Sequence, residues 1–204
     1  MSSETDVINL AAQLVGVTPI ISPGDGSITA NVTDDIYTEL RDQLLAGHPW
    51  NFATKRIKLA ESSTTPTFEF DHAYVLPSDW LRTVSVHDND AGHGTVLYRM
   101  EQLSDQLVLL SSSDQIWLRY IARITDPNLM TADFRRVLAT SLARDMAVKL
   151  VSSNSLQQAL SMQAKSILAQ ARSNDGMNSS PELRPRGSWA NSRGGWRRSD
   201  LFVD

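Results

Sequence analysis

Cysteine is absent from the sequence. Its absence excludes disulfide bonds, thiolate metal ligands and a cysteine nucleophile, so the fold must be stabilised by side-chain packing alone. Long apolar runs are absent as well: residues 1–6 lack the features of a secretory signal, and no window approaches the roughly 20 apolar residues of a membrane-spanning helix. We therefore expect a protein that is made in the cytoplasm and has no membrane partner.

Motifs that bind nucleotides or support catalysis are also absent. The sequence has no Gly-x-Ser-x-Gly elbow, no P-loop and no dinucleotide fingerprint. The histidines share no helical ligand spacing, and only His87 and His93 are close in sequence. We predict that the chain has no catalytic residues, no metal site and no cofactor, and that it is not an enzyme.

Two weaker chemical signals leave alternatives open. Asp88, Asp90 and Gly92 resemble part of a calcium loop, but the twelve-residue spacing with a terminal Glu is missing, which favours a hairpin turn. Several carboxylates could form a glycosidase pair if folding brings two of them to the right separation; otherwise they are solvated surface acids. These carboxylates are Glu61, Glu69, Asp71 and Asp79.

Charge is distributed unevenly along the chain. Residues 183–198 contain five arginines and no acidic residue, whereas the remaining 14 basic and 23 acidic residues give the rest of the chain a net charge of −9. An acidic body with a basic segment typically uses that segment to contact an acidic protein surface or a nucleic acid.

The pattern of apolar residues predicts the fold class. The 204 residues, of which 41% are apolar, suffice for one domain with a core. Helical spacing predicts helices at 5–16, 28–47, 132–151 and 154–174. Between residues 50 and 125 the spacing of the apolar residues shortens towards every second position. This predicts strands at 68–76, 83–87, 95–100, 106–110 and 115–124. Residues 1–175 are thus predicted to form an α+β body, a four-helix core with an inserted antiparallel β-meander.

Residues 176–204 show neither period and contain several prolines and glycines, which predicts an extended C-terminal arm. Arginine and tryptophan alternate in this arm, and both are enriched at the centres of protein interfaces. We interpret the arm as a segment that binds a partner, the alternative being a solvated, disordered tail. The candidate binding residues are Arg184, Arg186, Gly187, Ser188, Trp189, Arg193 and Trp196.

A second cluster, Pro49-Trp50-Asn51-Phe52, follows the second predicted helix. Pro49 can end the helix, Trp50 and Phe52 can bury large apolar surfaces, and Asn51 can hydrogen-bond to free backbone groups. We interpret these four residues as a structural corner that takes part in no reaction.

Several short motifs occur in a fixed order along the chain. They are Leu14 with Gly16 and Ile20, Pro49-Trp50-Asn51-Phe52-Ala53, Leu76-Pro77-Ser78-Asp79-Trp80-Leu81-Arg82, Leu118-Arg119-Tyr120-Ile121, Ala169-Gln170-Ala171-Arg172, and Gly187-Ser188-Trp189 with Arg193. In order and spacing these motifs resemble the tail tubular protein A family of short-tailed bacteriophages, and the resemblance covers almost the whole chain. The segments 87–94 and 197–204 match no pattern of this family.

The resemblance implies a structural protein of the virion, a head-to-tail adaptor (connector) at the head-tail junction. About twelve copies would form a ring beneath the portal protein, with the tail nozzle protein on the opposite side. Genomic DNA would pass through the channel without sequence-specific binding. By position, Gly187, Ser188, Trp189 and Arg193 would belong to the portal contact, while Trp50, Asn51 and Phe52 would brace the body.

Two other functions remain open at this stage. In a nucleic-acid-binding module, the arginines of the arm would neutralise phosphates while Trp189 and Trp196 stack on bases. In a phage cell-wall hydrolase, an acid and a base would face each other across a cleft.

Overall fold

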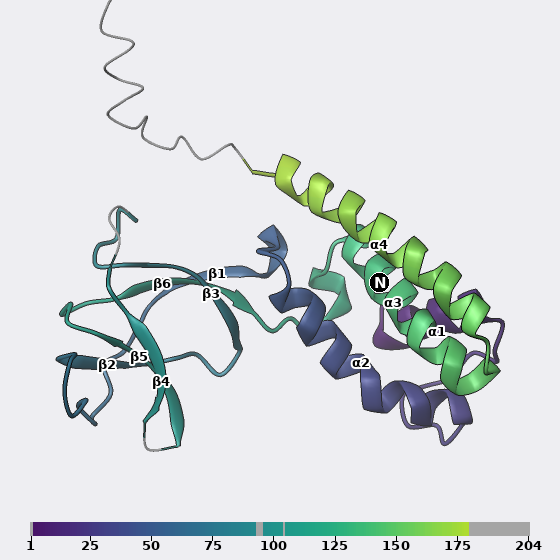
Figure 1. Cartoon of the computed structure of the whole chain (residues 1–204), viewed down its shortest axis with the longest axis horizontal. Coiled ribbons are helices and arrows are strands. Elements are labelled where there is room, and N and C mark those ends of the chain that lie inside the picture. The colour runs from purple at the N-terminus through teal and green to yellow at the C-terminus, as the bar shows by residue number, and fades with distance from the viewer. Residues whose placement is uncertain (1, 93–95, 104, 180–204) are drawn as a thin grey trace, which may run out of the picture.

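The structure is a computed structural model that describes residues 2–92, 96–103 and 105–179. It has two lobes, one built of helices and one built of strands (Figure 1). The predicted α+β class is confirmed, and so is the insertion of the strands between two pairs of helices. The helices of the described residues are α1 (Glu4–Val15), α2 (Ile28–Ala46), α3 (Ala132–Val151) and α4 (Asn154–Met177).

The central element of the helical lobe is α3, which packs against α1, α2 and α4. Ala139, Ala143 and Ala147 of α3 are fully buried, and their small side chains allow the neighbouring helices to approach closely. In the described part of the chain, every helix is too short or too polar to cross a membrane.

The ends of the outer helices follow from local chemistry. α1 ends at Gly16, which adopts the left-handed conformation (φ 80°) that a glycine tolerates without strain. α4 extends three residues beyond its predicted end at 174, so that residues 176 and 177, which we expected to begin the arm, belong to the helix. Contacts of Asp175, described below, explain this extension.

The β lobe differs from the predicted meander. Its strands form two antiparallel three-stranded sheets, in the orders β1-β6-β3 and β2-β5-β4. Among the described strands, only β4 and β5 are both consecutive in sequence and hydrogen-bonded to each other. The strands are β1 (Thr54–Lys58), β2 (His72–Val75), β3 (Trp80–His87), β4 (Arg99–Leu103), β5 (Gln106–Ser111) and β6 (Trp117–Ala122).

Burial explains why the strands divide into two sheets. Tyr74 and Leu109 of one sheet and Leu118 and Tyr120 of the other are nearly completely buried in the same core. A single meander would have exposed part of this apolar surface, whereas two facing sheets cover it.

Strand β1 was not predicted, because its sequence is mostly polar and nearly all of its residues are exposed. It is defined instead by antiparallel pairing with β6. The strand predicted at 95–100 lies at Arg99–Leu103.

Candidate functional site

The corner Pro49-Trp50-Asn51-Phe52 lies where the chain passes from α2 to β1 (Figure 1). The Trp50 side chain is fully buried, and its Nε1–H donates a hydrogen bond to the Leu44 carbonyl oxygen at 3.0 Å. The Trp50 and Phe52 rings both pack edge-on against Phe134 of α3, with ring centroids 5.2 and 5.1 Å from it. The corner thus joins the end of α2 to the central helix of the lobe.

The corner also holds the last turn of α4. The backbone N–H of Asn51 donates to both carboxylate oxygens of Asp175, at 3.2 and 3.1 Å, and Asn51 Nδ2 donates to the Asp175 carbonyl oxygen at 2.6 Å. Arg172 Nη2 donates to the carbonyl oxygen of Gly47 at 3.3 Å. We call this set of contacts the corner clamp, defined by Gly47, Asn51, Arg172 and Asp175.

His48 lies beside the corner clamp. Its Nε2 is 3.5 Å from the Asp175 carboxylate, and its ring packs edge-on against Trp50 with centroids 4.7 Å apart. Burial lowers the pKa of His48 below its ordinary value, and the positive charge of Arg172 adds to this effect, while Asp175 opposes it. The imidazole is therefore neutral at pH 7.

Sequence reasoning missed the partners of the corner. Asp175 lies 124 positions after Asn51, and no local pattern links the two. One signal was available: a carboxylate near the C-terminus of a helix is unfavourable next to the negative end of the helix dipole, so Asp175 required a partner elsewhere.

The predicted portal-binding residues of the arm lie outside the described residues. They are Arg184, Arg186, Gly187, Ser188, Trp189, Arg193 and Trp196. The structure does place the point from which this segment continues, because α4 ends at Met177 next to the corner and towards the β lobe (Figure 1).

Two of the motifs behind the family resemblance meet in the sheet β1-β6-β3 of the β lobe. In the pairing of β3 with β6, Trp80 lies opposite Ala122 and Arg82 opposite Ile121. Tyr120 Oη donates to the Asp79 carboxylate at 3.0 Å. Residues 76–82 and 118–121, which are far apart in sequence, therefore form one packed unit.

Polar contacts connect this unit to α2 of the helical lobe and to β1 of its own lobe. Arg82 Nη1 donates to the carbonyl oxygen of Ala46, at the end of α2, at 2.9 Å. Lys55 Nζ of β1 donates to the Asp79 carboxylate at 2.7 Å. Arg123, directly after β6, forms an ion pair with Asp42 of α2 at 2.7 Å. Polar contacts thus fix the orientation of the β lobe on the end of α2.

Three of the four carboxylates considered for a glycosidase pair already have partners. Glu61 accepts from His72 Nδ1 at 2.7 Å, and Glu69 pairs with Arg99 at 3.2 Å. Burial alone would raise the pKa of Asp79, but the hydrogen bonds from Lys55 and Tyr120 outweigh it and leave that pKa lowered. An acid catalyst requires a raised pKa, so Asp79 does not suit that role.

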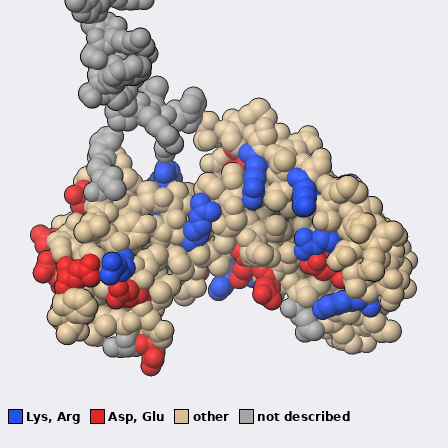
Figure 2. Space-filling view, viewed as in Figure 1, with Lys and Arg blue, Asp and Glu red and all other residues tan. Residues whose placement is uncertain are grey.

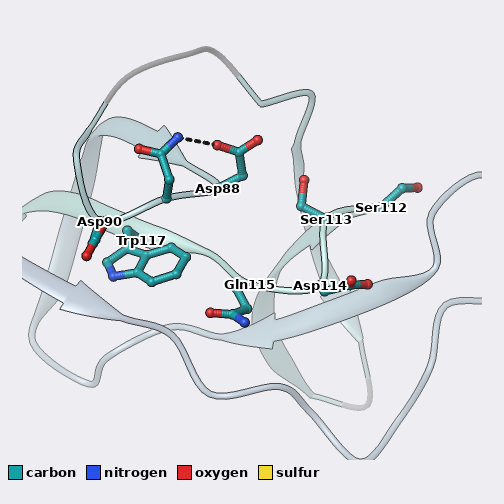
Figure 3. A pocket seen from close by; sticks show the side chains of 8 residues that line it. Asp88, Asp90, Ser112, Ser113, Asp114, Gln115 and Trp117 are labelled. Atoms are coloured by element: carbon teal, nitrogen blue, oxygen red, sulfur yellow. Dashed lines mark hydrogen bonds between the residues drawn. The ribbon is translucent and has the colours of Figure 1, made fainter.

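Two shallow depressions lie side by side on the β lobe. One, of about 810 Å³, is lined by carboxylates and hydroxyls around Asp88, Asp90 and Asp114 (Figure 3). The other, of about 640 Å³, contains Arg56 and Arg119. The indole of Trp117 lines both. No group of three His, Asp or Glu side chains in the described residues is arranged to hold a metal ion.

The segment considered for a calcium loop is a turn that follows β3. The N–H of Gly92 points to the carbonyl oxygen of Asn89 at 3.5 Å, and Gly92 adopts a positive φ of 71°. Asp88 and Asp90 line the acidic depression. Acidic side chains also gather at the outer end of the β lobe on the face in Figure 2.

No protein-family model matches the chain, and no curated protein is significantly similar to it.

Proposed function

We propose that this chain is a structural head-to-tail adaptor of a tailed bacteriophage, a virion protein that forms a ring of about twelve copies between the portal protein and the tail nozzle protein. In this function the body is a rigid block and the C-terminal arm binds the portal. Genomic DNA passes through the ring without sequence-specific recognition. No step of the function requires catalysis or a cofactor.

The observation that carries the proposal is the corner clamp. It fixes the last turn of α4 with three hydrogen bonds from Asn51 and one from Arg172, and the Arg- and Trp-rich segment begins at Arg184, seven positions after the end of α4 at Met177. An arm that transmits force between two particles needs a rigid attachment point. The clamp provides this point at the junction of the two lobes.

The spatial arrangement of the family-like motifs supports the same function. Residues 76–82 pack on residues 118–121. Next to the motifs 49–53 and 169–172, Asn51 donates to Asp175 and Arg172 donates to Gly47. Motifs that are scattered along the chain thus form one contacting pair, and two further motifs bind residues that flank each other's segments. This arrangement is expected of residues that maintain one family fold, whereas chance matches would show no preference for contact.

The engaged carboxylates of the β lobe weigh against a hydrolase. Glu61, Glu69 and Asp79 each have a cationic or hydrogen-bonding partner. A glycosidase would need an acid with a raised pKa and a second carboxylate on the opposite side of a cleft. A zymogram on bacterial cell walls tests this alternative directly, and we expect no clearing.

The decisive experiment is a mass measurement of the purified chain with and without the portal protein of the same phage. Alone, we expect a monomer or a loose assembly, because an arm that orders on binding gains its contacts only with the partner. With portal, sedimentation and negative-stain microscopy should show a closed ring attached to the portal. A chain that neither binds portal nor forms rings on it would overturn the proposal.

A further inference from the structure

A patch of basic and aromatic side chains covers the outer face of the sheet β1-β6-β3. Residues directly opposite each other in antiparallel strands point to the same face. Arg56 lies opposite Arg119, and Lys58 lies opposite Trp117. The intervening Leu118 points to the core, where it is almost completely buried. The register therefore gathers three cations around one indole on the outer face.

Strand β3 and the turn after it complete the patch. Ser85 lies opposite Arg119 on the other side of β6, and His87 lies opposite Trp117. The turn from Asn89 to Gly92 forms one wall of the depression of about 640 Å³. A flat sheet face thus becomes concave at the position of the cations.

Two of the three cations of β1, Arg56 and Lys58, are available for a ligand. Both Arg56 and Lys58 are exposed, and among the residues that the structure describes no carboxylate pairs with either side chain. Lys58 Nζ donates to Gln115 Oε1 at 2.8 Å and lies 5.0 Å from the centroid of the Trp117 ring. Its present partners are a neutral amide and an aromatic face, which an anion can replace.

Charged residues on an edge strand have a simpler explanation, because they prevent pairing with the edges of other sheets. That role needs neither a concave surface nor a half-exposed tryptophan between the cations. The combination of Arg56, Lys58, Arg119 and Trp117 is chemically complementary to a ligand with negative charges and a flat apolar part.

We propose that this patch, defined as Arg56, Lys58, Ser85, Trp117 and Arg119, binds single-stranded nucleic acid. The cations contact backbone phosphates, and the indole of Trp117 stacks on a base. Arg56 and Lys58 are roughly 7 Å apart along β1. At this separation the two side chains can contact different phosphates of one strand.

The geometry favours a single strand over a duplex. The faces of paired bases are stacked inside a double helix, so Trp117 can stack only on an unpaired base. The inference does not depend on the adaptor function, since the patch belongs to the β lobe and involves neither the arm nor the corner clamp.

Asp90 provides a test in the opposite direction. Its carboxylate lines both the basic and the acidic depression, next to Trp117 (Figure 3). At this position it repels phosphates that approach the cations. Removing its charge should strengthen binding, which is the opposite of what a loss of the folded patch would cause.

The experiment is fluorescence anisotropy with a labelled oligothymidylate of about 15 nucleotides, within the usual site sizes of single-strand binders. The full chain is compared with R56Q/K58Q, with D90N and with the control K149Q/K165Q, which removes the same charge from exposed positions of α3 and α4. We expect R56Q/K58Q to weaken binding roughly tenfold at low salt. Its salt slope should decrease by about 1.4, because each phosphate contact on a single strand contributes about 0.7. D90N should bind more tightly, and the control should match the parent chain.

Further measurements show which ligand binds and which part of the chain binds it. Trp117→Leu should lose binding, whereas Trp117→Phe should retain most of it, because a phenyl ring can stack on a base as the indole does. Replacing the five arginines of residues 183–198 by glutamine reveals the contribution of the arm, and the effect of R56Q/K58Q should persist in that background. The proposal is overturned if R56Q/K58Q binds like the control, if only duplex DNA binds, or if polyglutamate binds the patch equally well. Unchanged melting temperatures of the variants are the check on folding.

Discussion

Asp175 accepts the backbone N–H of Asn51 with both of its carboxylate oxygens, although the two residues are 124 positions apart. The carboxylate lies in the last turn of α4, where the helix dipole disfavours negative charge, and its side chain is only 6% exposed. The bonds from Asn51 offset this cost. Asp175 therefore connects the end of the last helix to the corner that precedes the β lobe.

The first prediction concerns this connection. Asp175→Ala removes the charged acceptor of the partly buried Asn51 N–H, so we expect a loss of about 1–3 kcal/mol in the free energy of unfolding. Asp175→Asn keeps an acceptor oxygen and should lose less. Urea unfolding measures both variants, and hydrogen exchange should show faster exchange at residues 170–178 in the alanine variant. Equal exchange in parent and Asp175→Ala chains would contradict a clamping role.

The second prediction concerns Trp50. Trp50→Ala should lower the free energy of unfolding by about 3–5 kcal/mol, since it removes a fully buried ring packed against Phe134. Trp50→Phe should cost less, because it keeps an aromatic ring and loses mainly the bond to the Leu44 carbonyl. The measurement is again chemical denaturation. A midpoint that does not change in Trp50→Ala would show that the corner is not packed in solution.

Helical periodicity predicted most of the fold because the apolar faces of the helices are regular. The predicted span of α3 agrees at both ends, and α1 and α2 agree to within one residue. The end of α4 could not be predicted from local sequence, since it depends on Asn51. The order of strands in the sheets could not be predicted either, because the pairing of β1 and β3 with β6 arises from the burial of both sheets in one core.

The candidate site was predicted in part. The residues of the corner, Trp50 above all, were identified from their chemistry alone. Their partners on α4 were not, because long-range contacts leave no trace in a single sequence beyond the misplaced charge of Asp175. The basic patch was missed for a different reason: it is formed by residues of β1, β3 and β6, and β1 was not recognised as a strand.

The third prediction is a pH dependence that arises from His48. Its pKa is lowered in the folded protein, chiefly by burial. As the pH falls below about 6.5, the unfolded chain takes up a proton that the folded chain does not. The contribution of His48 to stability is therefore complete above pH 6.5 and decreases as the pH falls towards the folded pKa.

The corresponding experiment compares thermal midpoints between pH 5 and pH 8, a range chosen to bracket the ordinary pKa of histidine of about 6.5. His48→Gln should show a smaller decrease towards acid pH than the parent chain. His72→Gln is the matched control: the hydrogen bond to Glu61 raises the pKa of His72, so its contribution is present below pH 6.5 and decreases as the pH rises. Identical profiles for both variants would exclude the assigned role of His48.

The fourth prediction separates folding from attachment. Deletion of residues 181–204 should leave the thermal midpoint nearly unchanged, because the sequence of this segment lacks the periodic apolar pattern of an element that packs into a core. The same deletion should abolish attachment to portal. Within the arm, Trp189→Ala should weaken portal binding by about 2 kcal/mol or more, and Arg197→Ala by less if it lies at a solvated rim. Pull-down with purified portal measures both, and infectious particles assembled with the truncated chain would refute the portal-binding role of the arm.

The central position of α3 has a consequence for biosynthesis. α2 ends at Ala46 and α3 begins at Ala132, so the ribosome makes the whole β lobe before the helix on which α1 and α2 pack. A nascent chain emerges N-terminus first, and isolated helices of this length are marginally stable in water. The β lobe is therefore the first part that can fold, while the apolar faces of α1 and α2 remain exposed until α3 has been made. The nascent chain is most prone to aggregation during this interval, and slower or cooler expression should matter more for its yield than for a protein whose helices pack in sequence order.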